Sequence, residues 1–301
     1  MHATEVLTPE EILALDPEGA DRLLDALERT VPVRSPLLPI PSRPDAELLV
    51  FGDTHGDWRS TLAAVEMASA PGTERWLLGL GDYVDRAPDD LPNGSVANAL
   101  HLLSLAARYP ERVYLLQGNH ETSRRIPCYP HNLPEEVDDL WGPEAERYHR
   151  LVGLLERGAY AAVTESGAYL AHAGFPRTLP SGSWRSAFEA MDDDRLSEIV
   201  WAECDASRIR RGAAPSWGAR ALSEFLVATG LGVVLRGHDP DVVGRPLYDG
   251  RCLTLHTTRI YERYGGVIVA VVPLGGRLES VKDLRVEHLP TEGRSYTDDR
   301  D

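Results

Sequence analysis

The sequence has almost no lysine. Lys282 is the single lysine among 31 basic residues, and it lies in V-K-D rather than in a G-K-S/T segment. A P-loop is therefore excluded, because it needs a lysine for the nucleotide phosphates. A Schiff-base mechanism would depend on this one residue and is disfavoured. We attribute the excess of arginine to the origin of the sequence rather than to its function.

Cysteine and long apolar runs are scarce as well. The three cysteines form no C-x-x-C pair, which argues against a disulfide framework and against a thiolate zinc site. We therefore expect a reducing, cytoplasmic location. The first residues lack a basic segment followed by an apolar one, and no run of eighteen apolar residues occurs. Neither an export signal nor a transmembrane segment is expected.

Basic residues are also fewer than acidic ones. The chain carries 31 basic and 47 acidic residues, a formal net charge of −16, which repels nucleic-acid phosphates and anionic lipid surfaces. We expect neither nucleic acid nor membrane as a partner, and the sequence makes no prediction of the oligomeric state. With 43% hydrophobic residues in 301, the chain can build one large or two medium domains.

The distribution of apolar residues and prolines divides the chain into three parts. Residues 1–46 are predicted to form a helical lead, begun by Thr8 before P-E-E, and a proline-rich connector. Residues 47–287 are predicted to form the main domain. Residues 288–301 have no apolar face and are predicted to form a flexible tail.

The main domain has an α/β pattern. Residues 58–68 and 96–108 have apolar side chains at helical spacing and separate the first three of six short apolar runs, which predicts a β-α-β-α-β unit with parallel strands. Further helices are expected at 140–157 and 219–228. The six runs that we interpret as buried strands are 47–51, 75–80, 112–117, 168–171, 233–236 and 266–272.

Polar motifs follow five of these runs directly. They are G-D-T-H-G, G-D-Y-V-D-R, G-N-H-E, H-A-G and G-H-D, in chain order. The carboxyl ends of strands in an open α/β sheet line one crevice, so motifs far apart in the sequence are expected to meet there. Any one of them is compatible with an ordinary turn, but five in order favour a shared site.

The residue types in these motifs suit two divalent cations. Asp53 and His55 are two residues apart, so in extended chain they point to the same side and can bind one ion. Asp82 can bridge to a second ion. Mixed oxygen and nitrogen donors suit Mn²⁺, our first expectation, with Fe or Zn²⁺ as alternatives. Two such ions can hold a bridging hydroxide that attacks a phosphate ester. Neutral donors for the second ion are Asn119, His172 and His238.

The same motifs contain groups for proton transfer and phosphate binding. His120 follows Asn119, so in extended chain it faces the opposite way and can reach the substrate as general acid. Asp85 is placed to orient it. Arg86 and Arg211 carry guanidinium groups suited to bidentate contact with phosphoryl oxygens.

These motifs resemble the signature set of the phosphoprotein phosphatase family of calcineurin-like metallophosphoesterases. The resemblance runs from about Leu48 to Glu287 and includes W-A-E-C-D, R-G-A-A-P-S-W-G and L-H-T-T-R-I-Y. It implies a β-sandwich flanked by helices, with a dinuclear metal site at the strand ends. It also implies the ligand and acid roles given above, the two phosphate arginines, and Tyr261 as an active-site tyrosine.

The sequence departs from the family pattern at three places. Ala87 stands where the family usually has glycine, Ala173 replaces the first glycine after the histidine, and T-T-R-I precedes Tyr261 in place of S-A-P-N. These departures bear on substrate choice and on sensitivity to inhibitors. The residues assigned to metals and phosphate are unaffected.

The other histidines carry less information. His256 lies beside the active-site loop that the resemblance implies. It has either a structural role or a functional one, in which it contacts the substrate or replaces a side chain of the family. The rest have no partner pattern and are expected to be ordinary: His2, His101, His131, His149 and His288.

The leading hypothesis is a metal-dependent phosphomonoesterase that acts on phosphoserine or phosphothreonine in proteins or peptides, without a phosphoenzyme. One alternative is a symmetrical dinucleoside-tetraphosphate hydrolase or another small-molecule phosphatase, because H-A-G and G-H-D also resemble that branch. The pair Asp85 and Arg86 favours the protein phosphatase. A second alternative is a catalytically silent scaffold, against which the complete ligand set argues.

Overall fold

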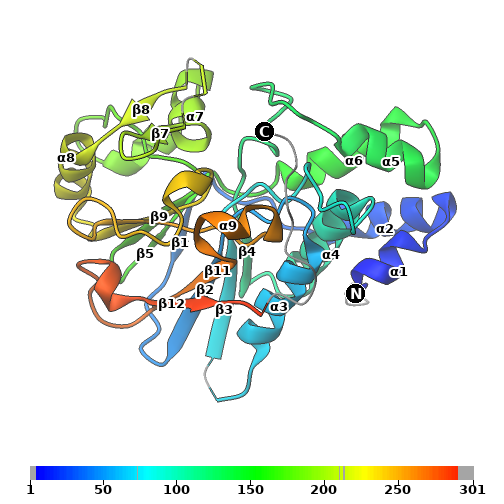
Figure 1. Cartoon of the computed structure of the whole chain (residues 1–301), viewed down its shortest axis with the longest axis horizontal. Coiled ribbons are helices and arrows are strands. Elements are labelled where there is room, and N and C mark those ends of the chain that lie inside the picture. The colour runs from blue at the N-terminus through cyan, green and yellow to red at the C-terminus, as the bar shows by residue number, and fades with distance from the viewer. Residues whose placement is uncertain (1–4, 73, 210, 213, 291–301) are drawn as a thin grey trace.

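Two five-stranded sheets pack face to face, and helices cover their outer faces (Figure 1). The computed structural model describes residues 5–290, except residues 73, 210 and 213. The predicted α/β sandwich flanked by helices is therefore confirmed. No helix within these described ranges combines the length and the apolar character needed to span a membrane.

The first sheet has the strand order β12-β11-β2-β3-β4. Strands β2, β3 and β4 run parallel, while β11 is antiparallel to both β2 and β12. Helices α3 (Trp58–Ser69) and α4 (Gly94–Arg108) connect the parallel strands, which confirms the predicted β-α-β-α-β unit. The strands are β2 (Ala46–Phe51), β3 (Glu74–Gly79), β4 (Val113–Leu115), β11 (Ile268–Pro273) and β12 (Arg285–His288).

The second sheet has the order β1-β5-β6-β9-β10. Its first strand, β1, lies within the segment predicted to be a connector, and it tolerates Pro39 because β1 is an edge strand. A separate ribbon pairs β7 (Glu203–Cys204) with β8 (Ser216–Trp217). The strands of the second sheet are β1 (Leu37–Ile40), β5 (Ala161–Thr164), β6 (Ala168–Ala171), β9 (Val233–Arg236) and β10 (Cys252–Thr254).

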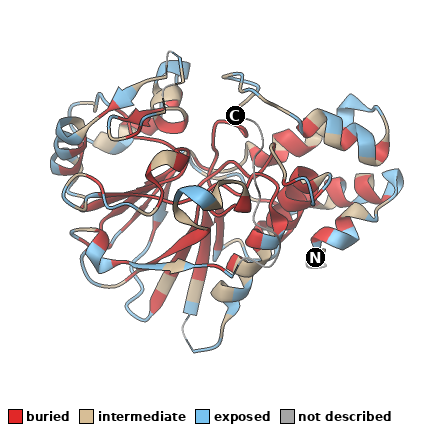
Figure 2. Cartoon of the chain, in the orientation of Figure 1, coloured by how far each residue is buried: buried red, intermediate tan, exposed pale blue. Residues whose placement is uncertain are grey.

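Strand β2 shows how the layers are held together. Leu48 and Val50 pack into the core between the two sheets, whereas Leu49 and Phe51 pack against the helices. All four side chains are fully buried because successive residues of a strand face opposite ways and both faces of this sheet are covered. Figure 2 shows the buried strands at the centre and the exposed residues on the outer helices and loops.

The remaining helices differ from the prediction, which did not include α7, α9 or most of α5. The segment 140–157 forms parts of two helices, because Gly142 adopts a φ of 83° and is followed by a proline. The helices are α1 (Pro9–Leu13), α2 (Pro17–Thr30), α5 (Leu133–Trp141), α6 (Ala145–Leu155), α7 (Asp193–Val200), α8 (Ala219–Thr229) and α9 (Glu262–Gly265), with 3₁₀ turns at Trp184–Phe188, Pro240–Val242, Arg259–Tyr261 and Val281–Asp283.

The helical lead packs into the main core. Leu24 and Leu27 of α2 are fully buried in the cluster that also contains residues of α4 and α6. The carboxylate of Asp21 accepts hydrogen bonds of 2.9 and 3.0 Å from the guanidinium of Arg147 on α6. At the other end, strand β12 includes the first residue of the predicted tail, and residues 291–301 of that tail lie outside the described part of the chain.

Truncation of a core residue in the lead tests whether it belongs to the cooperative unit. Leu24→Ala should lower the free energy of unfolding by about 2–5 kcal/mol, because it leaves a cavity in a fully buried cluster. Arg22→Ala on the same helix, where the side chain is 70% exposed, should change it by less than about 0.5 kcal/mol. Urea denaturation measures both. Equal small losses would show that the lead only rests on an independently folded domain.

Candidate metal centre

The five polar motifs lie at the carboxyl ends of five strands. Asp53, Asp82 and Asn119 follow β2, β3 and β4 of the first sheet, and His172 and His238 follow β6 and β9 of the second. Each of these residues is at most 5% exposed. The structure therefore brings donors from both sheets to one buried place.

The backbone at this place is unusual. His55, Asp82, Asp85, Arg86 and His238 have positive φ angles between 44° and 70°. Residues other than glycine rarely adopt this left-handed region, and they do so mostly where the surrounding structure requires it. The short turns after the strands thus hold five predicted site residues in strained conformations, as functional sites often do.

Two glycines allow the backbone to approach the carboxylates. A Cβ atom on Gly118 would lie 2.2 Å from Oδ1 of Asp82, and one on Gly237 would lie 2.1 Å from Oδ1 of Asp53. No side chain fits at either position. Any larger residue would displace a carboxylate from the site.

Four donor atoms converge in what we call the second-ion site, formed by Asp82, Asn119, His172 and His238. Nε2 of His172 lies 3.0 Å from Oδ1 of Asn119, 3.2 Å from Nδ1 of His238 and 3.3 Å from Oδ2 of Asp82. Nδ1 of His238 lies 3.0 Å from the same asparagine oxygen. Donors about 3 Å apart are what surround a divalent ion whose bonds are about 2.0–2.2 Å long.

Several of these atoms are acceptors that face each other. Nδ1 of His172 lies 3.2 Å from the carbonyl oxygen of Leu80, to which it donates, so Nε2 presents its lone pair to Asn119 and Asp82. While the ring is neutral, a carboxylate oxygen, an amide oxygen and this imidazole lone pair repel one another. Burial lowers the pKa of His172, but the charges of Asp82 and Asp53 outweigh burial and raise the pKa, because a proton on the ring relieves the repulsion. A cation removes this repulsion, so the donor set fits a metal ion.

The first-ion site is formed by Asp53, His55 and Asp82. Nε2 of His55 lies 3.9 Å from Oδ2 of Asp53 and 3.7 Å from Oδ2 of Asp82. Nδ1 of His55 lies 3.1 Å from the carbonyl oxygen of Val84, to which it donates, and this leaves Nε2 free to bind. The oxygen of Asp82 that faces His55 also faces His172 in the second-ion site, so Asp82 lies between the two sites.

Burial dominates the titration of the first-ion site. It raises the pKa of Asp53 to about 6, with the charge of His172 opposing this rise and that of Asp82 adding to it. Burial also lowers the pKa of His55 to about 3, so its imidazole is neutral and suited to a metal. Carboxylates with a neutral imidazole are a donor set for a divalent ion, and ligand atoms of His55, Asp82 and His120 all lie within 4.8 Å of one another.

His120 and Asp85 form a buried pair beside these sites. Nδ1 of His120 lies 2.5 Å from Oδ2 of Asp85, and Nε2 lies 3.9 Å from Oδ2 of Asp82. Burial lowers the pKa of His120, but the charge of Asp82 and the hydrogen bond to Asp85 outweigh burial and hold the pKa well above its usual value. His120 therefore carries a proton and has its second nitrogen on the side of the ion sites.

The expectation that His131 is an ordinary histidine was wrong. Its Nδ1 lies 2.9 Å from the oxygen of Asp85 that also binds His120, and its Nε2 lies 2.8 Å from the hydroxyl of Tyr148. Burial lowers the pKa of His131, but the hydrogen bonds to Asp85, Cys128 and Tyr148 and the charge of Asp85 together outweigh burial and raise the pKa to about 11. Cys128 completes the group, with Sγ 3.6 Å from Nδ1 of His120. Neither residue shows a sequence pattern that identifies this contact.

The predicted phosphate-binding residues flank the ion sites. Nη1 of Arg86 donates a 3.0 Å hydrogen bond to the hydroxyl of Tyr261, whose ring lies edge-on to that of His55. Arg211 lies beside the second-ion site, with Nη1 3.3 Å from Nε2 of His238 and a 3.4 Å ion pair to Glu203. The structure thus places the two guanidinium groups next to the centre.

Two buried glutamates support the loops and were missed from the sequence. Glu121 accepts hydrogen bonds of 2.7, 2.9 and 2.8 Å from the backbone N–H groups of Asp82, Tyr83 and Gly118, and burial raises its pKa to about 7. Glu203 accepts a 2.8 Å bond from the backbone N–H of Arg211. Both glutamates stand inside quoted motifs, G-N-H-E and W-A-E-C-D, which is the only signal that could have identified them.

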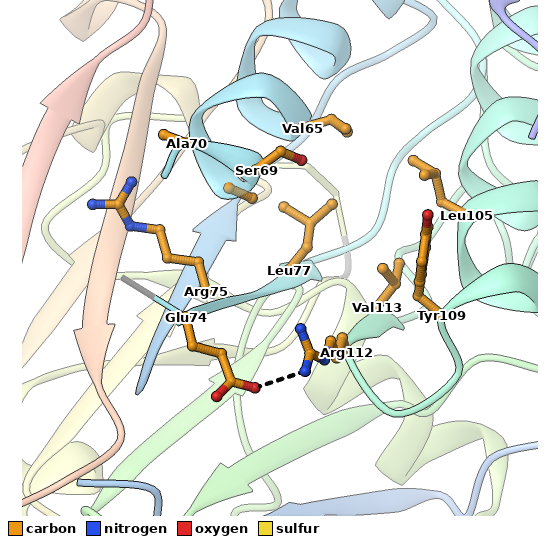
Figure 3. Close-up of a pocket in the computed structure, with 11 residues that line it drawn as sticks. Val65, Ser69, Ala70, Glu74, Arg75, Leu77, Leu105, Tyr109, Arg112 and Val113 are labelled. Carbon is orange, nitrogen blue, oxygen red and sulfur yellow. Dashed lines mark ion pairs between the residues drawn. The ribbon is translucent and has the colours of Figure 1, made fainter. Parts of the chain in front are cut away.

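An open groove of about 610 Å³ begins at Arg86 and Tyr261 and continues past Pro130 and Asn132. A different pocket, drawn in Figure 3, lies among α3, α4, β3 and β4, where Glu74 and Arg112 form a 3.1 Å ion pair. None of the residues that line this second pocket is a predicted site residue.

Comparisons with known proteins find relatives that are named as phosphatases. The chain is 27% identical over 240 residues to a protein phosphatase 2A catalytic subunit of Dictyostelium discoideum, covering 76% of this chain and 74% of that one. It is 25% identical over 250 residues to a probable serine/threonine-protein phosphatase of Encephalitozoon cuniculi, covering 79% of this chain but only 53% of the relative. The chain therefore spans about half the length of that second protein.

A solved structure has the same fold. It is a protein serine/threonine phosphatase from Saccharomyces cerevisiae with similarity to human phosphatase PP5, with a TM-score of 0.73, 20% identity and coverage of 96% of this chain and 91% of that one. The family model described as calcineurin-like phosphoesterase matches residues 46–242, which include both ion sites. Fold, site and family model agree, and the chain belongs to the calcineurin-like phosphoesterase family.

Proposed function

We propose that this protein is a metal-dependent serine/threonine protein phosphatase. The observation that carries the proposal is the position of His120, whose Nδ1 is bonded to Asp85 and whose Nε2 lies 3.9 Å from Oδ2 of Asp82, the carboxylate between the two ion sites. A proton donor next to two ion sites is the arrangement that phosphoester hydrolysis needs. The names of the relatives support a phosphoprotein as the substrate.

Divalent ions, when bound, supply a water of lowered pKa and positive charge for the phosphoryl oxygens, and we propose Mn²⁺ as the native pair. The ligands would be Asp53, His55 and Asp82 for the first ion, and Asp82 with Asn119, His172 and His238 for the second. The geometry of these donors, given above, supports both sets.

The chain's own residues supply the rest of the chemistry. His120 holds a proton at Nε2 for the leaving oxygen of the substrate, and Asp85 fixes the ring through Nδ1 and stabilises its charge. Arg86 and Arg211 present their guanidinium groups to the phosphoryl oxygens. The hydroxyl of Tyr261 orients Arg86 through their 3.0 Å hydrogen bond.

The groove beside Arg86 supports a polypeptide substrate. Its volume of about 610 Å³ accommodates residues that flank a phosphorylated side chain, and its lining includes Arg86 and Tyr261, which lie next to the ion sites. We propose that the substrate lies along this groove. The cytoplasmic location stays a prediction from the cysteine count.

Substitution of the acid tests the role of His120. His120→Asn should lower kcat on a phosphoserine peptide by about a hundredfold or more, because the alkoxide then leaves without a proton. The loss should be much smaller with p-nitrophenyl phosphate, whose leaving group needs no proton. His149→Asn, at an exposed position on α6, should leave both rates unchanged. Equal losses on the two substrates would exclude the acid role.

Removal of divalent ions should abolish hydrolysis and lower the melting temperature. The ions bind only the folded centre, so their loss removes both the reaction chemistry and a source of stability. Dialysis against a chelator, followed by addition of Mn²⁺, measures loss and recovery in one sample. Full activity in protein shown to be free of ions would contradict the proposal.

The choice of substrate can be measured directly. With Mn²⁺ present, kcat/KM should be higher for a phosphoserine or phosphothreonine peptide than for diadenosine tetraphosphate. The groove supports a peptide as substrate. A preference for the dinucleotide would replace the proposal with the small-molecule hydrolase considered from the sequence.

A further inference from the structure

His256 is a buried histidine that the residues assigned so far do not use. It follows β10 and forms an isolated β-bridge with Asp53, in which the backbone N–H of Thr257 donates a 2.9 Å hydrogen bond to the carbonyl oxygen of Asp53. The backbone N–H of Ile268 donates a 2.9 Å bond to the carbonyl oxygen of His256. The residue is therefore fixed in place on both sides, and it is only 1% exposed.

The imidazole of His256 makes no hydrogen bond to any residue that the structure describes. Within the described residues, neither Nδ1 nor Nε2 makes a hydrogen bond, although both atoms are buried. A buried polar group without a partner is unfavourable and calls for an explanation such as a missing ion or water. The second-ion histidines differ, since each has a partner at the ring nitrogen that faces away from the ion site: Nδ1 of His172 donates to the carbonyl oxygen of Leu80, and Nε2 of His238 lies 3.3 Å from Nη1 of Arg211.

The free ring is directed at the first-ion site. Nε2 of His256 lies 3.3 Å from Oδ2 of Asp53, the oxygen that lies 3.9 Å from Nε2 of His55. Nε2 of His55 in turn lies 3.7 Å from Oδ2 of Asp82. The imidazole of His256 thus places a fourth donor atom beside this site, at a distance from Asp53 that two ligands of one ion can have.

We propose that Nε2 of His256 is a further ligand of the first ion, together with Asp53, His55 and Asp82. This inference rests on the proposed function, because it assumes that the first-ion site holds a divalent ion. The ion would then be the partner of Nε2 of His256, which makes no hydrogen bond within the described residues. Neutral imidazole is the commonest metal ligand in proteins.

The added ligand changes the chemistry of the first ion. Two carboxylates and one histidine become two carboxylates and two histidines, so the first-ion site has as many nitrogen donors as the second. More imidazole favours borderline ions such as Zn²⁺ and Fe over Mn²⁺. The first ion should therefore be held more tightly, and with a stronger preference for Zn²⁺, than three ligands alone would give.

A second buried histidine provides the matched control. His101 on α4 is 4% exposed, and its Nε2 also lacks a partner, but its Nδ1 lies 2.7 Å from the carbonyl oxygen of Leu7, at the N-terminal lead rather than at the ion sites. His101→Gln therefore removes a buried imidazole without touching the centre. His256→Gln removes one of similar burial beside Asp53.

The experiment is a titration of ion-free wild type, His256→Gln and His101→Gln with Co²⁺, with the ions per chain and both dissociation constants measured. Wild type and His101→Gln should bind two ions alike. His256→Gln should keep one tight ion and bind the other about tenfold more weakly or worse. Two ions held with wild-type affinity by folded His256→Gln would overturn the inference, with circular dichroism as the check on folding.

Proton NMR of the wild type loaded with Co²⁺ gives a result that needs no variant. Four paramagnetically shifted imidazole N–H signals are expected, one from each of the coordinating histidines, His55, His172, His238 and His256. Three signals would overturn the inference and leave the proposed function standing. A wild-type chain that binds no Co²⁺ would contradict the proposed function itself, so the two failures are distinct.

Discussion

The structure depends on a buried group of carboxylate, amide and imidazole acceptor atoms whose mutual repulsion a bound cation would relieve. Asp53 and Asp82 are only 1% and 2% exposed, and their carboxylates lie within 4 Å of imidazole nitrogens, one of which also contacts the amide oxygen of Asn119. Burial of so many lone pairs is costly in an environment of low polarity unless a positive charge lies among them. The strained turns and the two glycines beside the carboxylates are understandable as the means of holding this arrangement.

The fold makes this arrangement possible because the donor residues come from both sheets. Parallel strands of both sheets end at the same place, and each contributes one short turn. Glu121 and Asp85 then secure the turns from outside, since each accepts hydrogen bonds from several backbone N–H groups of neighbouring loops. The rigid sheets and these two carboxylates leave the donors little freedom to move apart, which is what preorganisation for an ion requires.

Much of this could be predicted from the sequence because the signals were local. A short apolar run followed by glycine and a ligand-type residue marks a strand end, and five such ends imply convergence. His131 could not be found in this way, because its contact with Asp85 depends on how the loop before α5 folds back. Strand β1 was missed because proline normally argues against a strand, and only its edge position permits Pro39. Gly142 ended a helix inside a segment whose apolar spacing looked continuous.

The most direct test of the central claim is a crystal structure of the protein grown with Mn²⁺, with anomalous scattering recorded to locate the ions. The account predicts two anomalous peaks, one among Asp82, Asn119, His172 and His238 and the other beside Asp53, His55 and Asp82. A well-ordered centre without anomalous peaks, in which these side chains are satisfied by hydrogen bonds to one another, would contradict it.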